Sequence, residues 1–203
     1  MFNQLATQES IEKTKAAMET NGFSVIVAKD GAEAKEKVLE LVPKGAEVFA
    51  LSSETLKQTG ITKEIDESGN YSSIRAKLNS LDRQKDAVEM RKLGAAPDYA
   101  IGSAHAVTED GKILIASNTG SQLPADSYGA GQLILVIGTQ KITKDEAEAQ
   151  KRIREYVLPL ESARMNKQYN MTAGSVIRKL LTLYSEFNAK RITVILVNEV
   201  LGF

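Results

Sequence analysis

The segment GQLILVIGTQKITKDEA, residues 131–147, decides the fold class of this chain of 203 residues. Its aliphatic run at 133–137 has the length and composition of a strand that is buried on both faces. Gly138 ends the run, and Thr143 with Glu146 three residues later predicts the capping box of a helix. A buried strand that leads through a short turn into a helix is the repeating unit of an α/β protein with a parallel sheet.

The same alternation of strands and helices is predicted on both sides of this segment. Apolar runs bounded by turn residues predict further strands at 23–27, 47–52, 98–101, 112–116 and 192–197. Apolar residues at helical spacing predict helices after Asp30, after 52–55, over 74–94 without a break, from the capping box to Pro159, and over 176–187. The segments 57–70 and 118–131 are expected to be irregular. We therefore predict a mostly parallel sheet with helices on both faces.

Composition and charge describe an ordinary globular protein. No repeat or linker divides the sequence, so we expect one α/β domain over residues 1–203, in which residues 1–20 form a helical N-terminal extension. Lysine plus arginine and aspartate plus glutamate both number 26, so we expect no nucleic-acid binding. There is no secretion signal and no apolar run of about 20 residues, which predicts a cytoplasmic protein without membrane contact.

The chain has no cysteine and a single histidine, His105. Iron-sulfur ligation, zinc-cysteine sites and cysteine catalysis all need thiolates and are therefore excluded. Binding of a hard metal through carboxylates stays open, but no pattern indicates it. We predict neither a metal site nor a cofactor.

Ligands of parallel sheets bind outside the carboxyl ends of the strands, which here selects the segments 52–55, 102–111 and 138–141. The first contains Ser52, Ser53, Glu54 and Thr55 between a predicted strand and a predicted helix. Backbone N–H groups and hydroxyls at such a position can hold an anion at the positive end of the helix dipole. Serine is also a preferred N-cap residue without any ligand, and spacing alone favours simple capping.

Gly102, Ser103 and His105 lie in the second segment. His105 is the only imidazole for acid-base chemistry near neutral pH, although a lone histidine is more often structural. No G-x-S-x-G pattern surrounds Ser103, so a Ser-His-Asp triad fits poorly. His105 is therefore a weak catalytic candidate, while Gly102 and Ser103 are candidate ligand-binding residues.

Glu109 precedes Asp110-Gly111, a pair of residues typical of a hairpin turn. Glu109 is either a solvated flank of that turn or a carboxylate held over a pocket, and turn chemistry alone favours the flank. Lys141 follows the buried strand and could neutralise a phosphate or carboxylate, although a solvated lysine is the commoner outcome.

Together these segments resemble the lactate-utilisation domain, or LUD domain, family. Residues 53–56 (SETL) are similar to the family's serine-glutamate-threonine-leucine, and 106–111 (AVTEDG) to its alanine-isoleucine-alanine-glutamate-threonine-glycine. Residues 138–142 (GTQKI) resemble its glycine-x-asparagine-lysine-isoleucine, and the closing strand with Leu201-Gly202 is also similar. The resemblance extends from about Gly45 to the carboxyl end.

The resemblance implies a Rossmann-like fold with the topology of CoA-transferases and sugar-phosphate isomerases. It also implies a role in L-lactate oxidation or related carbon metabolism, with iron-sulfur and oxidoreductase proteins as partner subunits. From the family pattern we expect Glu109 to face the same pocket as Ser53 and Lys141.

Three hypotheses for the function follow. The leading one is an accessory or ligand-binding subunit of L-lactate utilisation that binds a small anionic metabolite such as lactate, CoA or a nucleotide-like compound. The alternative is an enzyme of the CoA-transferase or sugar-phosphate isomerase type with Glu109 as nucleophile or general base. The third is a structural partner of an iron-sulfur protein. Ligand binding, turnover and tight complex formation distinguish these hypotheses.

Overall fold

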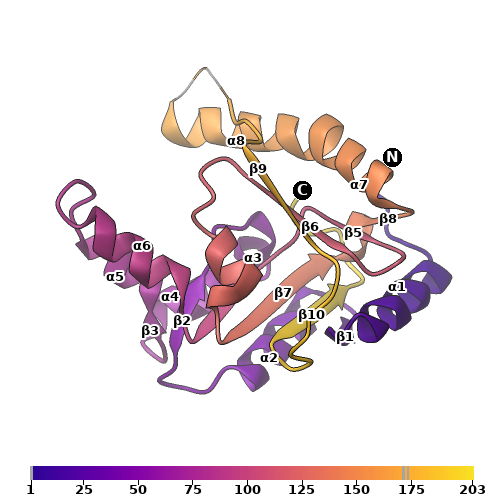
Figure 1. The fold of residues 1–203 in the computed structure, drawn as a ribbon, viewed down its shortest axis with the longest axis horizontal. Helices are drawn as coiled ribbons and strands as arrows, with labels where there is room; N and C mark the ends of the chain where they lie inside the picture. The colour runs from indigo at the N-terminus through magenta and orange to yellow at the C-terminus, as the bar shows by residue number, and fades with distance from the viewer. Residues whose placement is uncertain (1, 171, 173) are drawn as a thin grey trace.

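Six parallel strands form the central sheet of the computed structural model, which describes residues 2–170, 172 and 174–203. Their order is β1-β10-β7-β4-β2-β3, and all neighbours pair in parallel. The strands are β1 (Ser24–Ala28), β2 (Glu47–Ala50), β3 (Ser72–Ser73), β4 (Tyr99–Gly102), β7 (Gln132–Gly138) and β10 (Ile192–Val197). Figure 1 shows β7 and β10 side by side, and the predicted α/β fold with a parallel sheet is confirmed.

Side chains along β7 alternate between two apolar cores, because successive residues of a strand point to opposite faces of the sheet. Leu133, Leu135 and Ile137 belong to one core. Ile134 and Val136 belong to the other. All five are at most 2% exposed, which explains why this run contains no polar residue.

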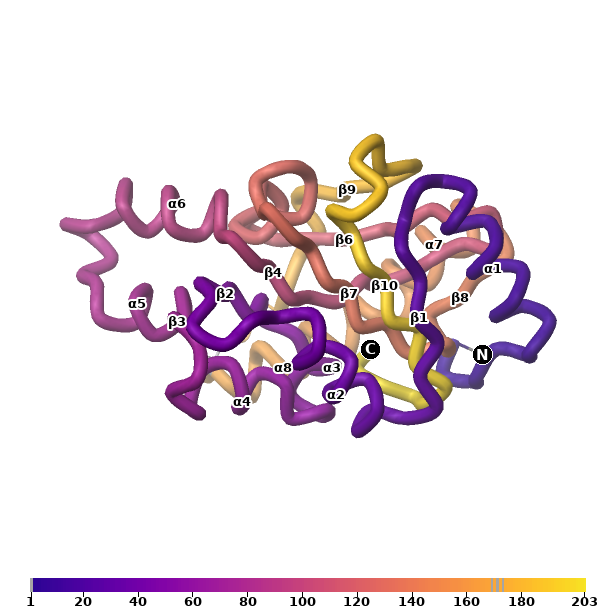
Figure 2. Tube along the Cα trace, turned by 90° about the horizontal axis from the view of Figure 1, so that it is seen from below, coloured from indigo at the N-terminus to yellow at the C-terminus, as the bar shows by residue number. Residues whose placement is uncertain are grey.

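Helices α2 (Gly31–Leu41), α3 (Glu54–Gln58) and α4 (Ile61–Glu67) pack on one face of the central sheet, and Figure 2 shows them on the same side. Helix α1 (Gln8–Thr20) and a second, smaller sheet cover the other face. Helices α5 (Ile74–Ser80) and α6 (Ala87–Ala95) project from the edge near β3 (Figure 1). The prediction of helices on both faces, with a helix near the amino terminus, is confirmed.

Four strands form the second sheet in the order β8-β5-β6-β9. They are β5 (Ala106–Thr108), β6 (Ile113–Ser117), β8 (Ile142–Thr143) and β9 (Lys179–Leu183). β5 and β6 form the predicted hairpin, whose Gly111 has a φ of +86°, a conformation that favours glycine. The chain passes from the central to the second sheet at two points: residues 103–105 join β4 to β5, and the 3-10 turn η2 (Thr139–Lys141) joins β7 to β8.

The predicted unbroken helix over 74–94 is two helices, α5 and α6, separated by a turn at Asp82. The carboxylate of Asp82 accepts hydrogen bonds from the backbone N–H groups of Gln84 and Lys85, at 2.8 and 2.9 Å. A side chain that bonds local backbone groups competes with the hydrogen bonds of a helix. The bonds of Asp82 therefore favour the turn that separates α5 from α6. The segment 57–70, predicted to be irregular, contains α4.

The helix after β8 is capped two residues later than predicted. Asp145 rather than Thr143 is the N-cap, because its carboxylate accepts a hydrogen bond from the backbone N–H of Glu148 at 2.9 Å. The Thr143 hydroxyl instead donates to the carbonyl of Val107 at 2.9 Å, which joins β8 to β5.

Pro159, predicted to end this helix, lies inside it. Helix α7 (Glu146–Arg152), the π-helical turn η3 (Ile153–Val157) and helix α8 (Leu158–Tyr169) follow one another directly. The N–H of Leu158 donates five residues back to the carbonyl of Ile153. Pro159 thus lies in the first turn of α8, where a missing N–H is tolerated.

The helix predicted over 176–187 is not formed, and the strand β9 lies there instead. β9 pairs antiparallel with the whole of β6, from Ile113 opposite Leu183 to Ser117 opposite Lys179. The apolar side chains that indicated a buried helical stripe are mostly exposed, Phe187 completely. Pairing with β6 therefore overrides the helical spacing.

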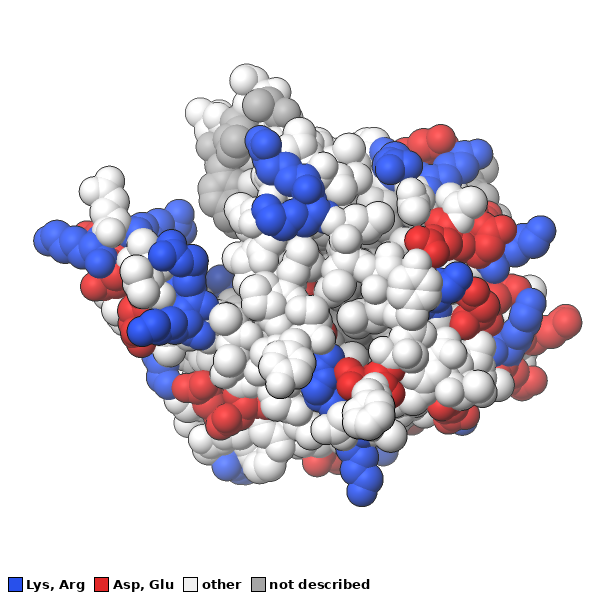
Figure 3. Space-filling model, in the orientation of Figure 1, with Lys and Arg blue, Asp and Glu red and all other residues white. Residues whose placement is uncertain are grey.

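Charges are unevenly distributed over the surface in spite of the zero net charge. Figure 3 shows lysine and arginine side chains gathered over the α5–α6 projection, which a hollow separates from the rest of this face. The exposed basic residues of the projection are Lys77, Arg83, Lys85, Arg91 and Lys92. Separately, none of the helices in the described part of the chain is long and apolar enough to cross a membrane.

Candidate functional site

Lys141 lies where the two connections that lead from the central sheet to the second sheet meet. Its Nζ donates hydrogen bonds to Thr55 Oγ1 at 3.0 Å, to Ser103 Oγ at 3.1 Å and to the carbonyl oxygen of Ala104 at 3.1 Å. Thr55 comes from α3, Ser103 and Ala104 from the β4–β5 connection, and Lys141 from η2. We call these four residues the Lys141 cluster. The structure thus brings three predicted ligand-binding residues together from three distant segments.

Lys141 is a buried amine whose hydrogen-bond partners are all neutral. The residue is 3% exposed, and it forms no ion pair with any Asp or Glu that the structure describes. Burial first, and then the charge of Arg152, lower the pKa of Lys141 from 10.5 to about 7. Near neutral pH both the ammonium and the free amine are therefore populated.

Arg152 is a second buried cation. It is completely buried, donates to the carbonyl oxygens of His105 and Phe2, and lies over the ring of Tyr156. Its Nε is buried and has no acceptor among the described residues. Burial lowers the pKa of Arg152 only to about 10, so the guanidinium keeps its charge at neutral pH. This residue was not among the site residues predicted from the sequence.

His105 is a neutral imidazole in this environment. Its Nδ1 accepts a hydrogen bond from the backbone N–H of Ala116 at 3.1 Å, which places the proton on Nε2. Burial first, and then the charges of Lys141 and Arg152, lower the pKa of His105 from 6.5 to about 3. His105 is thus a hydrogen-bond donor, and the geometry gives no support to its role as a base near neutral pH.

Ser53 and Thr55 have different contacts although they are neighbours in the same motif. Ser53 is the N-cap of α3, and its Oγ accepts a hydrogen bond from the backbone N–H of Leu56 at 3.3 Å. Thr55 is 1% exposed and contacts Lys141. The contact of Ser53 is therefore that of simple capping, whereas Thr55 belongs to the cluster.

Ser52 and Glu54 are held by contacts outside the cluster. Ser52 Oγ accepts a hydrogen bond from Arg75 at 3.3 Å. The carboxylate of Glu54 pairs with Lys57 at 2.7 Å and lies 3.7 Å from Arg164, which comes from α8. Both side chains thus join elements of the fold near the beginning of α3.

Gly102 ends β4 and has no room for a side chain. A Cβ atom there would lie 2.9 Å from Cδ1 of Leu51 and 3.5 Å from Cδ2 of Leu135. The contacts of Gly102 are therefore those of core packing. The next residue, Ser103, belongs to the Lys141 cluster.

Residues 198–202, which follow β10 and which we call the strap, close over the Lys141 cluster. The carbonyl oxygen of Leu201 accepts hydrogen bonds from Gln140 Nε2 at 2.7 Å and from Thr55 Oγ1 at 3.3 Å. Gly202 has a φ of +64°, and a Cβ atom on it would lie 2.5 Å from Thr55 Oγ1. Glycine is thus needed both for the backbone conformation and for the close approach to the cluster.

Glu109 lies away from the cluster, against α1. Its carboxylate accepts hydrogen bonds from Ser10 Oγ and Lys13 Nζ, both at 2.8 Å. These bonds, with that of Lys13 the stronger, lower the pKa of Glu109. The family pattern led us to expect Glu109 in the same pocket as Ser53 and Lys141. The structure does not bring Glu109 together with these residues.

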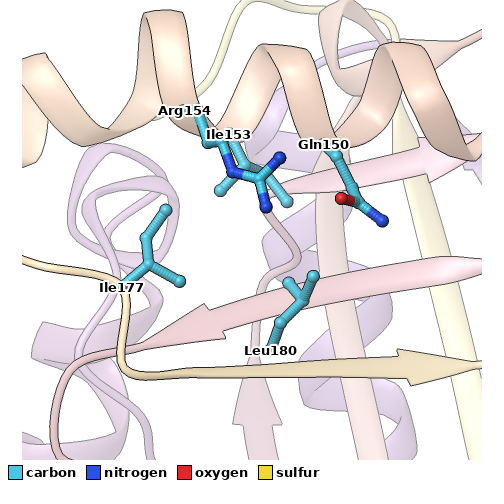
Figure 4. A pocket seen from close by; sticks show the side chains of 5 residues that line it. All are labelled: Gln150, Ile153, Arg154, Ile177 and Leu180. Carbon is cyan, nitrogen blue, oxygen red and sulfur yellow. The ribbon is translucent and has the colours of Figure 1, made fainter.

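A separate small pocket lies between the α7–η3 helix and the segment around β9 (Figure 4). Its lining consists of Gln150, Ile153, Arg154, Ile177 and Leu180. Its volume of about 60 Å³ is well below the roughly 300 Å³ at which small-molecule sites begin. This pocket includes no residue of the Lys141 cluster.

Comparisons with known proteins agree with the fold and with part of the sequence analysis. The family model described as "LUD domain" matches residues 11–197. A crystal structure of a DUF162 family protein from Deinococcus radiodurans is similar with a TM-score of 0.59 and 12% identity. The match covers 96% of this chain and 100% of that one, and at this identity it supports the fold alone. A comparison with curated proteins finds no match.

Proposed function

This chain belongs to the LUD domain family, and on that premise we propose that it binds a small anionic metabolite beside Lys141, where its two sheets meet. The family is associated with lactate utilisation. We propose that the ligand is a metabolite of that process, such as lactate, CoA or a nucleotide-like compound, and that the protein is an accessory or ligand-binding subunit. Iron-sulfur and oxidoreductase proteins remain the predicted partners.

The observation that carries this proposal is the buried Nζ of Lys141, which has no carboxylate partner in the part of the chain that the structure describes. Burial of an ammonium group is costly unless an anion or strong hydrogen bonds compensate for the lost water. Three neutral oxygens compensate in part, and an anionic ligand would supply the missing charge.

The surroundings of Lys141 add a second cation and a donor. Arg152 is charged and buried nearby, and the Nε2–H of His105 is available as a neutral donor. A carboxylate or phosphate in such a low-dielectric, positive environment is bound more strongly than at an exposed lysine.

The strap must move for a ligand to reach Lys141, because the residue is 3% exposed. Few polar contacts hold this end of the strap. They include the two hydrogen bonds to the Leu201 carbonyl and one from the N–H of Gly202 to Gln58 at 2.7 Å. The side chain of Leu201 is 3% exposed and belongs to the core, so opening of the strap also costs the burial of this side chain, but it costs less than unfolding of the whole domain.

The alternative hypothesis, an enzyme that uses Glu109 as nucleophile or base, gains no support from the contacts of that residue. A carboxylate that accepts two hydrogen bonds, one from an ammonium group, is stabilised as an anion and is a poor nucleophile. Turnover by this family member would have to use other groups.

Thermal unfolding with L-lactate, coenzyme A and ATP as separate additions tests the binding proposal. We expect at least one of them to raise the Tm of the wild type, because a ligand that binds the native state stabilises it. Lys141→Met should weaken that ligand at least tenfold, and Lys141→Arg should weaken it less because the charge is kept.

Lys112→Met is the matched control, since Lys112 pairs with Asp110 at 2.9 Å at the surface of the same small sheet. It should leave the affinity unchanged. The proposal is wrong if none of the three compounds raises the Tm, or if Lys141→Met binds the active compound as tightly as the wild type does.

A further inference from the structure

We propose that Lys141 is a carbonyl-reactive amine that forms an imine with a small 2-oxo acid. This inference rests on the proposed function, because the oxo acid would occupy the same anion site, but it adds a covalent step and a defined class of substrate. The juxtaposition behind it is a buried amine among neutral oxygens and a second buried cation, Arg152, that bonds the carbonyl of the adjacent residue His105. No carboxylate of the described residues holds the amine as an ammonium ion.

The nitrogen of Lys141 is present in part as a free amine near neutral pH. An amine attacks a carbonyl carbon only through a free lone pair, and most lysines lack one near neutral pH. Lysines acquire nucleophilic character when they are desolvated and placed next to another cation. Lys141 meets both conditions, since it is 3% exposed and the charge of Arg152 disfavours its protonation.

Two hydroxyl groups lie close enough to Nζ of Lys141 to carry protons to and from it. The hydroxyls of Thr55 and Ser103 lie 3.0 and 3.1 Å from Nζ, and they lie 3.3 Å from each other. A hydroxyl both accepts and donates a proton, so this pair can carry a proton from the attacking nitrogen to the carbonyl oxygen.

The chemistry balances without any further reactant. The Nζ lone pair forms a C–N bond while the carbonyl π electrons move to oxygen, and a proton passes from nitrogen to that oxygen to give a carbinolamine. The carbinolamine hydroxyl takes a proton from the Thr55–Ser103 hydroxyl pair and leaves as water when the nitrogen lone pair forms the C=N bond. The remaining N–H proton then returns to that pair, which leaves the neutral imine. One water is released for each imine, nothing is oxidised or reduced, and hydrolysis reverses the step.

The buried charge of Arg152, which acts on Lys141, selects the class of carbonyl compound. When Lys141 becomes an imine, the guanidinium of Arg152 keeps its charge, and its buried Nε–H has no acceptor among the residues that are described. A carboxylate adjacent to the carbonyl would be stabilised by this charge. The closed strap and the burial of Lys141 favour a small molecule, so a short 2-oxo acid fits better than an aldehyde without charge.

Reductive trapping of the full-length chain tests the inference. The protein is incubated with pyruvate as the probe and with sodium cyanoborohydride, which reduces an imine to a stable secondary amine. Digestion and mass spectrometry then locate the adduct. We expect Lys141 to be modified at least ten times faster than exposed lysines such as Lys85, and Lys141→Arg to lose this fast component while Lys112→Arg keeps it.

The pH dependence provides a readout that a merely structural lysine would not give. Labelling of Lys141 should increase between pH 6 and 8, where exposed lysines remain protonated and slow. If all lysines react alike at every pH, or if Lys141 stays unmodified while others react, the inference is overturned.

The same samples separate this inference from the binding proposal. If an anion raises the Tm in a Lys141-dependent manner but pyruvate leaves no adduct at Lys141, the covalent step is wrong and the binding site stands. If Lys141 is labelled rapidly while no anion binds, the amine is reactive and the binding proposal is wrong. Failure of both measurements removes both.

Discussion

The two ends of the short strand β5 differ in chemistry although only a few residues separate them. At its beginning lie His105 and the Lys141 cluster, where none of the described carboxylates pairs with the buried cation. Beyond its end, Glu109 forms an ordinary ion pair with Lys13, and these side chains are 24% and 63% exposed. The difference teaches that neighbouring residues of one sequence motif can belong to two separate sites, here the Lys141 cluster and the surface beside α1.

The register of the second sheet explains this separation. β5 and β8 run parallel, with Val107 opposite Ile142 and Thr108 opposite Thr143. Lys141 therefore lies level with the first residue of β5, whereas Glu109 lies three residues further along. At about 3.3 Å per residue the two positions are roughly 10 Å apart along the strand direction.

The pH dependence of Lys141→Met should give the largest effect at the first end. The folded pKa of Lys141 is about 7, below its unfolded value of 10.5, so burial of the ammonium destabilises the wild type fully below pH 7. This cost is relieved as the pH rises from about 7 to 10.5. Over this range the unfolding free energy of the wild type, relative to that of Lys141→Met, should therefore increase by up to about 1.4 kcal/mol per pH unit.

Urea unfolding of both proteins from pH 6 to 9.5 measures this gain. Lys112→Met serves as a control for the general effect of losing a lysine. Parallel profiles for the wild type and Lys141→Met would mean that Lys141 is solvated and that the contrast between the two ends is false.

Gly111→Ala tests the second end and should be the next largest effect. Gly111 has a φ of +86°, and a Cβ atom there would lie 2.8 Å from backbone atoms of Ala17 and Met18 in α1. Strain and overpacking together should lower the unfolding free energy by about 2–3 kcal/mol. Gly45→Ala is the matched control, because its φ is +82° but nothing lies within 4 Å of the added Cβ.

The comparison of these two variants in urea unfolding isolates the contact with α1. Gly45→Ala should cost about 1 kcal/mol, from the backbone strain alone. Equal costs for the two variants would show that the hairpin does not press against α1.

Glu109→Gln should give the smallest effect. Its partner Lys13 is largely exposed, and exposed ion pairs contribute little to stability, so the Tm should change by about 2 °C or less. The affinity for any ligand bound at Lys141 should stay the same. A loss of binding without a loss of stability would place Glu109 in the site after all and would favour the enzyme hypothesis.

The central sheet was predictable because buried parallel strands leave a signal of their own. The aliphatic runs of β7 and β10 have few alternative environments, and both predicted strands are found. The closeness of Lys141 and Thr55 was also predictable, since both follow strands at the same edge of the sheet.

The features that the sequence did not predict depend on contacts between distant segments. The apolar spacing of 176–187 fits a helix equally well, and pairing with β6 decides for a strand. Arg152 follows Ala149 by three residues on the buried helical stripe, which was the available signal that a charge would enter the core. The register that separates Glu109 from Lys141 exists only once β8 has paired with β5.

The π-helical turn η3 sets the rotational phase of everything that follows it. Each residue of a regular helix turns the direction of its side chain by about 100°, so one residue more or less rotates the whole of α8 by that angle. Arg152, before the turn, points into the core, and Arg164, after it, reaches Glu54. A deletion of a single residue within Ile153–Val157 would turn Arg164 away from Glu54 while Arg152 stayed in place. At this point the fold therefore tolerates a substitution far better than an insertion or a deletion.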